Sequence, residues 1–290
     1  GALQRLMFQP FTEKAPAKIN LALHVLGRRA DGYHELDSAV AFADVGDELA
    51  FAPASEFALT AEGPFADGLP AVSDNIILKA RELAARIAAN RGRSLPGAAI
   101  RLTKNLPVAS GIGGGSANGA AALRGLLRLA GIEARDPKVM ATALGLGADV
   151  PVCLRATSCR MGGIGERLAD LPDLAPMAAV LVNPGLGLAT ASVFGRLGLE
   201  PGEGHGAALD TASDPSSWRN DLTAPAMALA PQISEVLELL ASGEGLRFAR
   251  MSGSGATCFG VYASAEASAM AARALASARP RWWVRQTVLR

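Results

Sequence analysis

The chain has 290 residues, half of them apolar, and its 28 basic residues nearly balance its 27 acidic ones. This length and apolar content allow one large domain or two of ordinary size, and they exclude disorder as the dominant state. No run of Lys or Arg forms a stripe, which excludes the electrostatic footprint of a nucleic-acid-binding protein. A phosphorylated ligand would therefore have to be held by local geometry.

The cysteines and the longest uncharged stretch bear on where the protein works. Cys153, Cys159 and Cys258 lie in apolar surroundings without the spacing of a zinc site or a disulfide framework, so we expect buried thiols in a reducing cytoplasm. Residues 174–195 are interrupted by prolines and glycines and predict a buried strand and a turn rather than a membrane span. We expect a cytoplasmic protein, monomeric or homodimeric, that binds neither nucleic acid nor membrane.

The first half of the chain alternates strand-like and helical patterns. Apolar residues at every second position predict strands at residues 17–25, 40–51 and 99–103. Residues 73–90 place apolar side chains at helical spacing behind Ser73 and Asp74, which predicts an amphipathic helix with an N-cap. A further helix is expected from Asp136, because Pro137 suits the first helical position.

A glycine-rich loop follows the third predicted strand. It opens at Pro107, has four glycines among residues 111–115, and leads into an alanine-rich helix at residues 116–130. Without Cβ atoms, consecutive N–H groups can point at one anion, and the N-terminus of the helix adds partial positive charge. The loop therefore predicts a phosphate site, with a flexible turn as the alternative.

The better-known phosphate-binding templates do not match this loop. Gly115 is followed by Ser116 and Ala117, so the lysine of a P-loop is missing. Ser116 also stands where a dinucleotide-binding fingerprint has its third glycine. A second small-residue loop, Ser252-Gly253-Ser254-Gly255-Ala256, offers another backbone concavity of phosphate size.

The second half predicts a new series of strands and helices. Residues 162–165 form a turn, and we place the domain boundary there because the new series begins at residue 178. Residues 198–217 are rich in Gly, Ser, Asp and Pro and predict a mobile loop. Helices are expected at residues 231–241 and 265–278, and strands at residues 257–263 and 282–289.

Three separated segments match a known pattern: Pro16-Ala17-Lys18-Ile19-Asn20-Leu21, Leu106-Pro107 through Asn118, and Ser252-Gly253-Ser254-Gly255-Ala256. They resemble the three motifs of the GHMP kinase superfamily, which phosphorylates galactose, homoserine, mevalonate and related alcohols. Three more segments narrow the resemblance to the branch whose substrate is a cytidine diphosphate-linked methylerythritol. They are Arg29-Ala30-Asp31-Gly32-Tyr33-His34-Glu35-Leu36, Leu146-Gly147-Ala148-Asp149-Val150-Pro151 and Gly163-Ile164-Gly165-Glu166.

The resemblance implies a two-domain α+β fold. Residues 1–165 would form an N-terminal ATP-binding domain similar to the second domain of ribosomal protein S5, and residues 166–290 a ferredoxin-like C-terminal domain. The implied activity is ATP-dependent phosphorylation of the 2-hydroxyl of the methylerythritol substrate, in the non-mevalonate isoprenoid pathway. ATP and Mg²⁺ are the implied cofactors, and the metal ligands stay open.

Two residues receive catalytic roles from the resemblance. Asp149 would be the general base that accepts the proton of the attacking hydroxyl. Lys18 would keep that carboxylate ionised and lower the pKa of the hydroxyl. The structural alternatives are a helix or turn cap for Asp149 and an exposed strand lysine for Lys18.

The glycine-rich loop is similar to the triphosphate cradle of the superfamily. The implied ATP-binding residues are Pro107, Val108, Ala109, Ser110, Gly111, Ile112, Gly113, Gly114, Gly115, Ser116 and Ala117, with Asn75 and Lys104 as further contacts. Asn75 could instead start a helix, Lys104 could be a solvated charge, and Ser116 could cap the helix. The loop departs from the family pattern because Ala109 and Ser110 replace glycines and Ala117 replaces a serine.

The resemblance also implies a substrate site. Its residues would be Asn20, Tyr33, His34, Thr190 and Phe194, joined by Ser252, Gly253, Ser254 and Gly255. A cytosine would stack between Tyr33 and Phe194 while His34 binds its edge. The alternatives are a core residue for Phe194 and a turn residue for Tyr33.

Two other functions remain open from the sequence. A mevalonate-type or homoserine-type kinase would share the ATP machinery, but Tyr33 and His34 argue against it. A nonenzymatic nucleotide-binding regulator would keep the loop and lose catalysis, whereas this chain has both Lys18 and Asp149.

Overall fold

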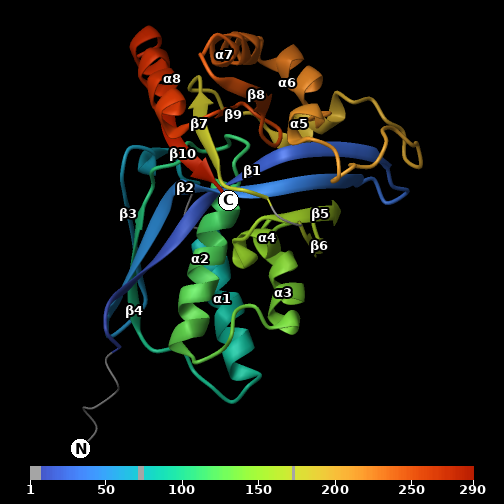
Figure 1. Ribbon diagram of the computed structural model, residues 1–290. Coiled ribbons are helices and arrows are strands. Elements are labelled where there is room, and N and C mark those ends of the chain that lie inside the picture. Colours follow the sequence, from blue (N-terminus) through green and yellow to red (C-terminus); the bar gives the residue numbers. More distant parts are fainter. Residues whose placement is uncertain (1–7, 71–74, 172–173) are drawn as a thin grey trace, which may run out of the picture. The chain divides into compact units, whose positions relative to one another are not determined.

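A computed structural model describes residues 8–70, 75–171 and 174–290 (Figure 1). Its contacts divide the chain into two compact units. Unit 1 comprises Gly1–Pro16, Gly46–Val108 and Gly114–Arg155, and unit 2 comprises Ala17–Val45, Ala109–Gly113 and Ala156–Arg290. Both units contain helices and strands, which confirms the predicted two-part α+β class.

The two units alternate along the sequence because two long strands contribute to both. These strands are β1 (Phe11–Arg28) and β2 (His34–Pro53). The division into an N-terminal ATP-binding domain, residues 1–165, and a C-terminal domain, residues 166–290, stays a prediction.

Unit 1 combines a small sheet with a group of helices. Besides parts of β1 and β2, its strands are β3 (Ala58–Glu62) and β4 (Ala98–Thr103). Its helices are α1 (Ile76–Ala89), α2 (Gly114–Leu129), α3 (Pro137–Ala143) and α4 (Val150–Arg155). β4 pairs antiparallel with β2 and parallel with β3. Parallel neighbours require a crossover connection, and α1 supplies it between β3 and β4. α1 also packs against α2.

Unit 2 contains the remaining strands and helices. Its further strands are β5 (Cys159–Gly163), β6 (Arg167–Asp170), β7 (Met177–Asn183), β8 (Leu246–Met251), β9 (Cys258–Tyr262) and β10 (Trp283–Leu289). Its helices are α5 (Thr190–Gly195), α6 (Thr223–Leu229), α7 (Gln232–Ala241) and α8 (Ala265–Ala278). β5 pairs with the first part of β2 and with β6.

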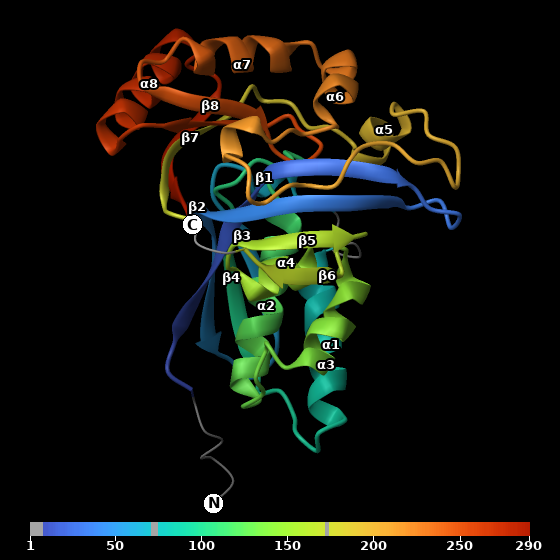
Figure 2. The same cartoon turned by 45° about the vertical axis from the view of Figure 1, so that its right-hand side comes forward.

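The C-terminal sheet of unit 2 has the ferredoxin-like order. Its strands are antiparallel neighbours in the order β10, β7, β9, β8. In the chain, α5, α6 and α7 lie between β7 and β8, β9 follows β8 directly, and α8 connects β9 to β10. Figure 2 shows α7 and α8 on the same side of the sheet. This arrangement agrees with the fold that the resemblance implies.

The apolar core between that sheet and α7 is explained by the two-residue period of a strand and the helical period of α7. Val180 and Val182 lie two residues apart on β7, so both face the same side of the strand. Ile233, Val236 and Leu240 recur at helical spacing on α7 and pack in the same buried cluster. The apolar stripe of the helix therefore covers the apolar face of the strand.

Two predicted helix starts differ from the structure. α1 begins at Ile76, and Asn75 is its N-cap, with the side chain accepting a hydrogen bond from Ile77 N (2.9 Å). Ser73 and Asp74, the predicted caps, lie outside the described residues. α2 begins at Gly114, so Ser116 lies inside its first turn and the prediction that it caps the helix is wrong.

Residues 198–217 form a loop that ends in a short 3-10 helix, Pro215–Ser217, and the mobility of this loop stays a prediction. Residues 202–206 bond to the end of β1 through backbone hydrogen bonds, including Arg28 N to Glu203 O (2.7 Å) and His205 N to Leu26 O (2.8 Å). Gly, Ser and Pro predict the absence of helix and strand, whereas mobility depends on such tertiary bonds.

Several short elements were not predicted, namely β3, β5, β6, β8, α4, α5 and α6 (Thr223–Leu229). Each has four to seven residues, which is too short for a periodicity to be recognised. Within the part of the chain that the structure describes, no helix has the length and apolar character needed to cross a membrane.

Candidate active site

Two glycine-containing loops of unit 2 pack backbone against backbone. Gly111 has a φ of +78°, and a Cβ on it would lie 2.5 Å from Ser252 O and 2.7 Å from Gly255 N. Gly253 has a φ of +56°, and a Cβ on it would lie 2.6 Å from Gly111 O. Neither position accepts a side chain, so the glycines bring together two loops that are far apart in sequence.

Asn20 on β1 joins these loops. Its backbone N–H donates to Ser252 Oγ (3.0 Å), and that hydroxyl donates to Gly111 O (3.0 Å). The Asn20 side chain donates from Nδ2 to Ser38 Oγ (2.8 Å), while its Oδ1 is buried without a hydrogen-bond partner among the described residues. A buried acceptor of this kind is normally satisfied, so this atom is an exception among the described residues, and substrate binding by Asn20 stays a prediction.

Lys18 lies two residues earlier on the same strand and is buried. Its backbone N–H donates to Ile112 O (2.9 Å), and its Cβ and Cε lie 3.2 Å from the position of a Cβ on Gly113. The side chain therefore runs against the glycine-rich loop, and the alternative of an exposed strand lysine is wrong.

Thr190 and Ser254, both predicted substrate-site residues, are in contact. Their hydroxyl oxygens are 3.0 Å apart, and Thr190 is the first residue of α5. Unit 2 thus brings together predicted site residues from four regions of the sequence, around residues 20, 111, 190 and 252.

Two aromatic side chains of the predicted site, those of His34 and Phe194, lie close together. The rings of His34 and Phe194 lie 4.8 Å apart with an interplanar angle of 34°. Burial, followed by Arg28 and His205, lowers the pKa of His34, which favours the neutral form of its ring. Tyr33 is 61% exposed in the turn before β2, and its role as a clamp with Phe194 stays a prediction.

A buried histidine lies further along β1. His24 Nδ1 is 3.2 Å from Ala207 O, to which it donates as the protonated ring nitrogen, and its Nε2 is buried without a partner among the described residues. Burial is the main cause that lowers the pKa of His24; Arg219 adds to it, while Asp221 and Asp37 oppose it.

This pKa predicts an acid-sensitive stability. Because the pKa is lower in the folded than in the unfolded protein, the stabilisation is complete above about pH 6.5 and is lost as the pH falls through the folded value. We expect urea unfolding at about pH 5.5 to give a lower free energy of unfolding than at about pH 7.5, and His24→Gln to reduce that difference. An identical pH dependence in His24→Gln would contradict this assignment. Asp37, whose pKa is lowered by Arg160 and Leu209 N–H against the effect of burial, titrates below this window.

In unit 1, Asp47 organises the start of the glycine-rich loop. Its Oδ1 accepts from Asn105 N (2.6 Å) and Leu106 N (2.8 Å), and its Oδ2 accepts from Lys104 Nζ (2.5 Å). With its amide nitrogen toward Asp47, Asn118 on α2 also donates to Oδ2 (2.9 Å). This buried carboxylate is therefore fully hydrogen-bonded.

Lys104, a predicted ATP contact, is 2% exposed, so the alternative of a solvated charge is wrong. Burial lowers the pKa of Lys104, and the adjacent Asp47 carboxylate opposes this effect. Its Nζ lies 3.2 Å from the position of a Cβ on Gly114, the first residue of α2. Asp47 was not among the predicted site residues, although an acidic residue inside a predicted apolar strand is a signal of a buried ion pair.

Ala109 replaces a glycine of the family pattern, and its backbone keeps a conformation that glycine favours. It has a φ of +50°, a region in which a non-glycine residue costs roughly 1–2 kcal/mol. Its carbonyl accepts from Leu188 N (3.1 Å) within unit 2. The loop thus keeps a backbone conformation that suits glycine while carrying a methyl group.

Asp149 belongs to unit 1, directly before α4, and its carbonyl accepts from Cys153 N (3.1 Å). The side chain is half-buried. Because Lys18 belongs to unit 2, the joint action of the two residues stays a prediction. Asn75 serves as the cap of α1, as its structural alternative predicted, and its contact with ATP is likewise a prediction.

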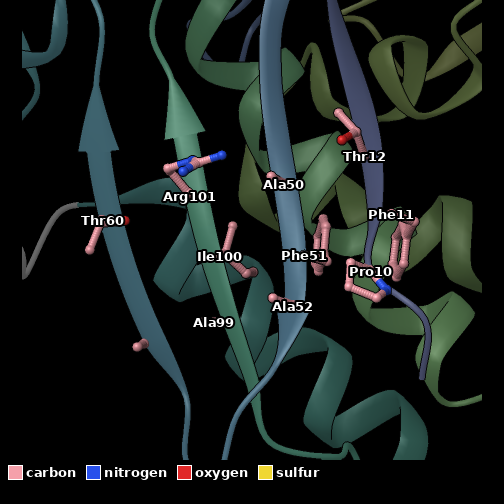
Figure 3. A pocket seen from close by; sticks show the side chains of 11 residues that line it. Pro10, Phe11, Thr12, Ala50, Phe51, Ala52, Thr60, Ala99, Ile100 and Arg101 are labelled. Carbon is pink, nitrogen blue, oxygen red and sulfur yellow. The ribbon is translucent and has the colours of Figure 1, made fainter. Parts of the chain in front are cut away.

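A hollow in unit 1 lies away from the predicted site residues. It measures about 490 Å³ and lies over the sheet of unit 1, where the rings of Phe11 and Phe51 stack 4.8 Å apart (Figure 3). Its lining contains none of the predicted site residues. This hollow is therefore not the site that the sequence predicts.

Comparison with known proteins shows the family of this chain. The family described as GHMP kinases N terminal domain matches residues 75–157, and GHMP kinases C terminal matches residues 211–280. A 4-diphosphocytidyl-2-C-methyl-D-erythritol kinase of Bradyrhizobium sp. is 45% identical, covering 98% of this chain and 96% of the relative. One of that name from Paramagnetospirillum magneticum is 48% identical over 94% and 96%. The chain belongs to the GHMP kinase family.

Solved structures of GHMP kinases agree with this membership. A crystal structure of 4-(cytidine 5'-diphospho)-2C-methyl-D-erythritol kinase is 33% identical, with a TM-score of 0.79 over 96% of this chain and 99% of that one. A homoserine kinase from Cytophaga hutchinsonii has a TM-score of 0.70 at 18% identity, covering 98% and 96%, which concerns the fold alone. The similarity in sequence and fold to these kinases confirms the prediction of an ATP-dependent small-molecule kinase.

Proposed function

We propose that this GHMP kinase transfers the γ-phosphoryl group of ATP to the 2-hydroxyl of 4-diphosphocytidyl-2-C-methyl-D-erythritol, giving the 2-phosphate and ADP. The observation that carries the proposal is identity of 45–48% over nearly the whole chain to kinases of that name. The reaction belongs to the non-mevalonate route to isoprenoid precursors.

Asp149 acts as the general base in this proposal. It accepts the proton of the 2-hydroxyl as the oxygen forms a bond to the γ-phosphorus and the bond from that phosphorus to the β-phosphate bridging oxygen breaks. Lys18 lowers the pKa of the hydroxyl by its positive charge, and its burial in unit 2 strengthens that effect.

The glycine-rich loop, residues 107–117, binds the triphosphate. The positive φ angles at Gly111 and Gly113 support this role because they let backbone N–H groups converge on an anion. Lys104 adds a fixed cation beside the first turn of α2, where the helix dipole also favours negative charge.

Mg²⁺ accompanies ATP in this proposal and offsets the charge of its phosphate oxygens. Across the described residues, His, Cys, Asp and Glu form no group of three that could hold a metal. Mg²⁺ usually binds through phosphate oxygens, water and only one or two protein oxygens, so a site of that kind fits these residues. The Ser116 hydroxyl in the first turn of α2 is one such oxygen.

Unit 2 supplies the alcohol site. Asn20 Oδ1 offers an unpaired buried acceptor to a substrate hydroxyl, and His34 with Phe194 forms an aromatic wall for the cytosine, closed by Tyr33. Thr190 and Ser254 supply hydroxyls beside them. The near-zero net charge supports an enzyme that does not bind nucleic acid, and the buried thiols support a cytoplasmic location. A monomer or homodimer is part of the proposal.

The proposal is tested by ADP release with Mg²⁺ and ATP. The cytidylylated methylerythritol would be compared with mevalonate, homoserine and galactose at matched concentrations. We expect turnover of the cytidylylated substrate at least about 100-fold above the others, because the other alcohols lack the base that the aromatic wall binds. Faster turnover of another alcohol would overturn the substrate, and no turnover of any would favour a binding-only role.

A further inference from the structure

Asn220 is a buried amide that the proposed chemistry does not use. It lies just before α6, and its Nδ2 donates to Met251 O (2.8 Å) and Gly253 O (2.9 Å). Its Oδ1 accepts from Leu222 N (2.9 Å). One side chain therefore holds the end of β8 and the loop Ser252 to Ala256.

The backbone around Asn220 is attached to β1. Leu23 N donates to Arg219 O (2.9 Å), and Asp221 N donates back to Leu23 O (2.9 Å). The carboxylate of Asp221 accepts from Val25 N (2.8 Å). Asn220 thus forms an isolated parallel β-bridge with Leu23 of β1, the strand that carries Lys18 and Asn20.

The loop held by Asn220 carries the contacts of the candidate alcohol site. Ser252 Oγ accepts from Asn20 N, and Ser254 Oγ lies 3.0 Å from Thr190 Oγ1. A shift of Gly253 O would move the serines on both sides of it. We propose that Asn220 is a positioning residue that fixes Ser252 and Ser254 relative to Asn20 for phosphoryl transfer to the alcohol. This inference rests on the proposed function.

The chemistry of the site requires an amide and not a carboxylate. Both atoms that face Nδ2 are carbonyl oxygens, so only an N–H donor satisfies them, which fixes the orientation of the amide. Aspartate has the same shape but would place a charged acceptor against two acceptors. Asn220→Asp should therefore release the loop without creating a cavity.

The test measures kcat and the KM of each substrate for Asn220→Asp. We expect kcat/KM for the alcohol to fall about 10- to 100-fold, since a displacement of about 1 Å in a reacting group can cost about 100-fold. The KM for ATP should stay within about twofold. Asn220→Ser, which can keep one donor, should give an intermediate loss and supplies the measurement if the aspartate variant does not fold.

Tyr262→Phe is the matched control. Tyr262 is buried in unit 2 and donates to Leu240 O (3.1 Å), so its replacement also removes a side-chain bond to a carbonyl, away from the loop Ser252 to Ala256. We expect a lower melting temperature and wild-type kinetic constants. All assays are run below the melting temperature of every variant.

Two results would overturn the role of Asn220. One is wild-type kinetic constants in Asn220→Asp or Asn220→Ser, and the other is an equal kinetic loss in Tyr262→Phe, which would mean that reduced stability alone is responsible. The wild type is assayed on the full set of alcohols, so an error in the proposed substrate appears there, and the variants are then compared on the alcohol that it phosphorylates.

Discussion

Asp149→Asn is expected to lower kcat by about 100- to 10,000-fold, the usual contribution of a general base. The amide keeps the shape of the side chain but cannot accept the proton of the attacking hydroxyl. ATP should still bind, because the glycine-rich loop and Lys104 are unchanged. Steady-state ADP release and calorimetric titration of ATP measure the two quantities.

A matched control is Asp136→Asn, which makes the same change directly before another helix of unit 1. Asp136 caps α3 by accepting from Lys138 N (2.8 Å), and Asn is an equally good cap. We expect wild-type kcat in this variant. Activity of Asp149→Asn within about threefold of the wild type would remove Asp149 from the mechanism.

Asp47→Ala is expected to destabilise the protein by about 3–5 kcal/mol. The change leaves the Lys104 ammonium buried without its carboxylate and removes the acceptor for Asn105 N and Leu106 N. The pKa of Lys104, already lowered by burial, should fall further because the opposing effect of Asp47 is lost. Urea unfolding monitored by circular dichroism measures the loss.

The double variant Asp47→Leu with Lys104→Met separates the two causes. Replacing both partners of a buried ion pair by apolar groups is often close to neutral, so the double variant should be more stable than Asp47→Ala. Equal destabilisation in the two would show that the lost bonds to Asn105 and Leu106, and not the unpaired charge, cause the effect. A loss below about 1 kcal/mol in Asp47→Ala would contradict the prediction.

The candidate site was predictable where its chemistry is carried by local sequence. The loop at residues 107–117 is readable because glycines allow the positive φ that Gly111 and Gly113 adopt. Asp47 and Asn220 were not found, because their roles come from partners in other segments, such as Lys104 for the first and Gly253 for the second. An acidic residue inside an apolar strand, as at Asp47, signals a buried ion pair, but no pattern near either residue identifies its partner.

The sequence by itself determined the α+β class, the longer strands and helices, and the glycine-rich loops, because apolar periodicity and backbone freedom are local properties. Only the tertiary structure decided that Lys104 is buried, that residues 202–206 bond to the end of β1, and that the loops at Gly111 and Gly253 touch. Burial and hydrogen bonding between distant segments depend on which surfaces meet when the chain folds. A residue's neighbours along the chain do not specify that.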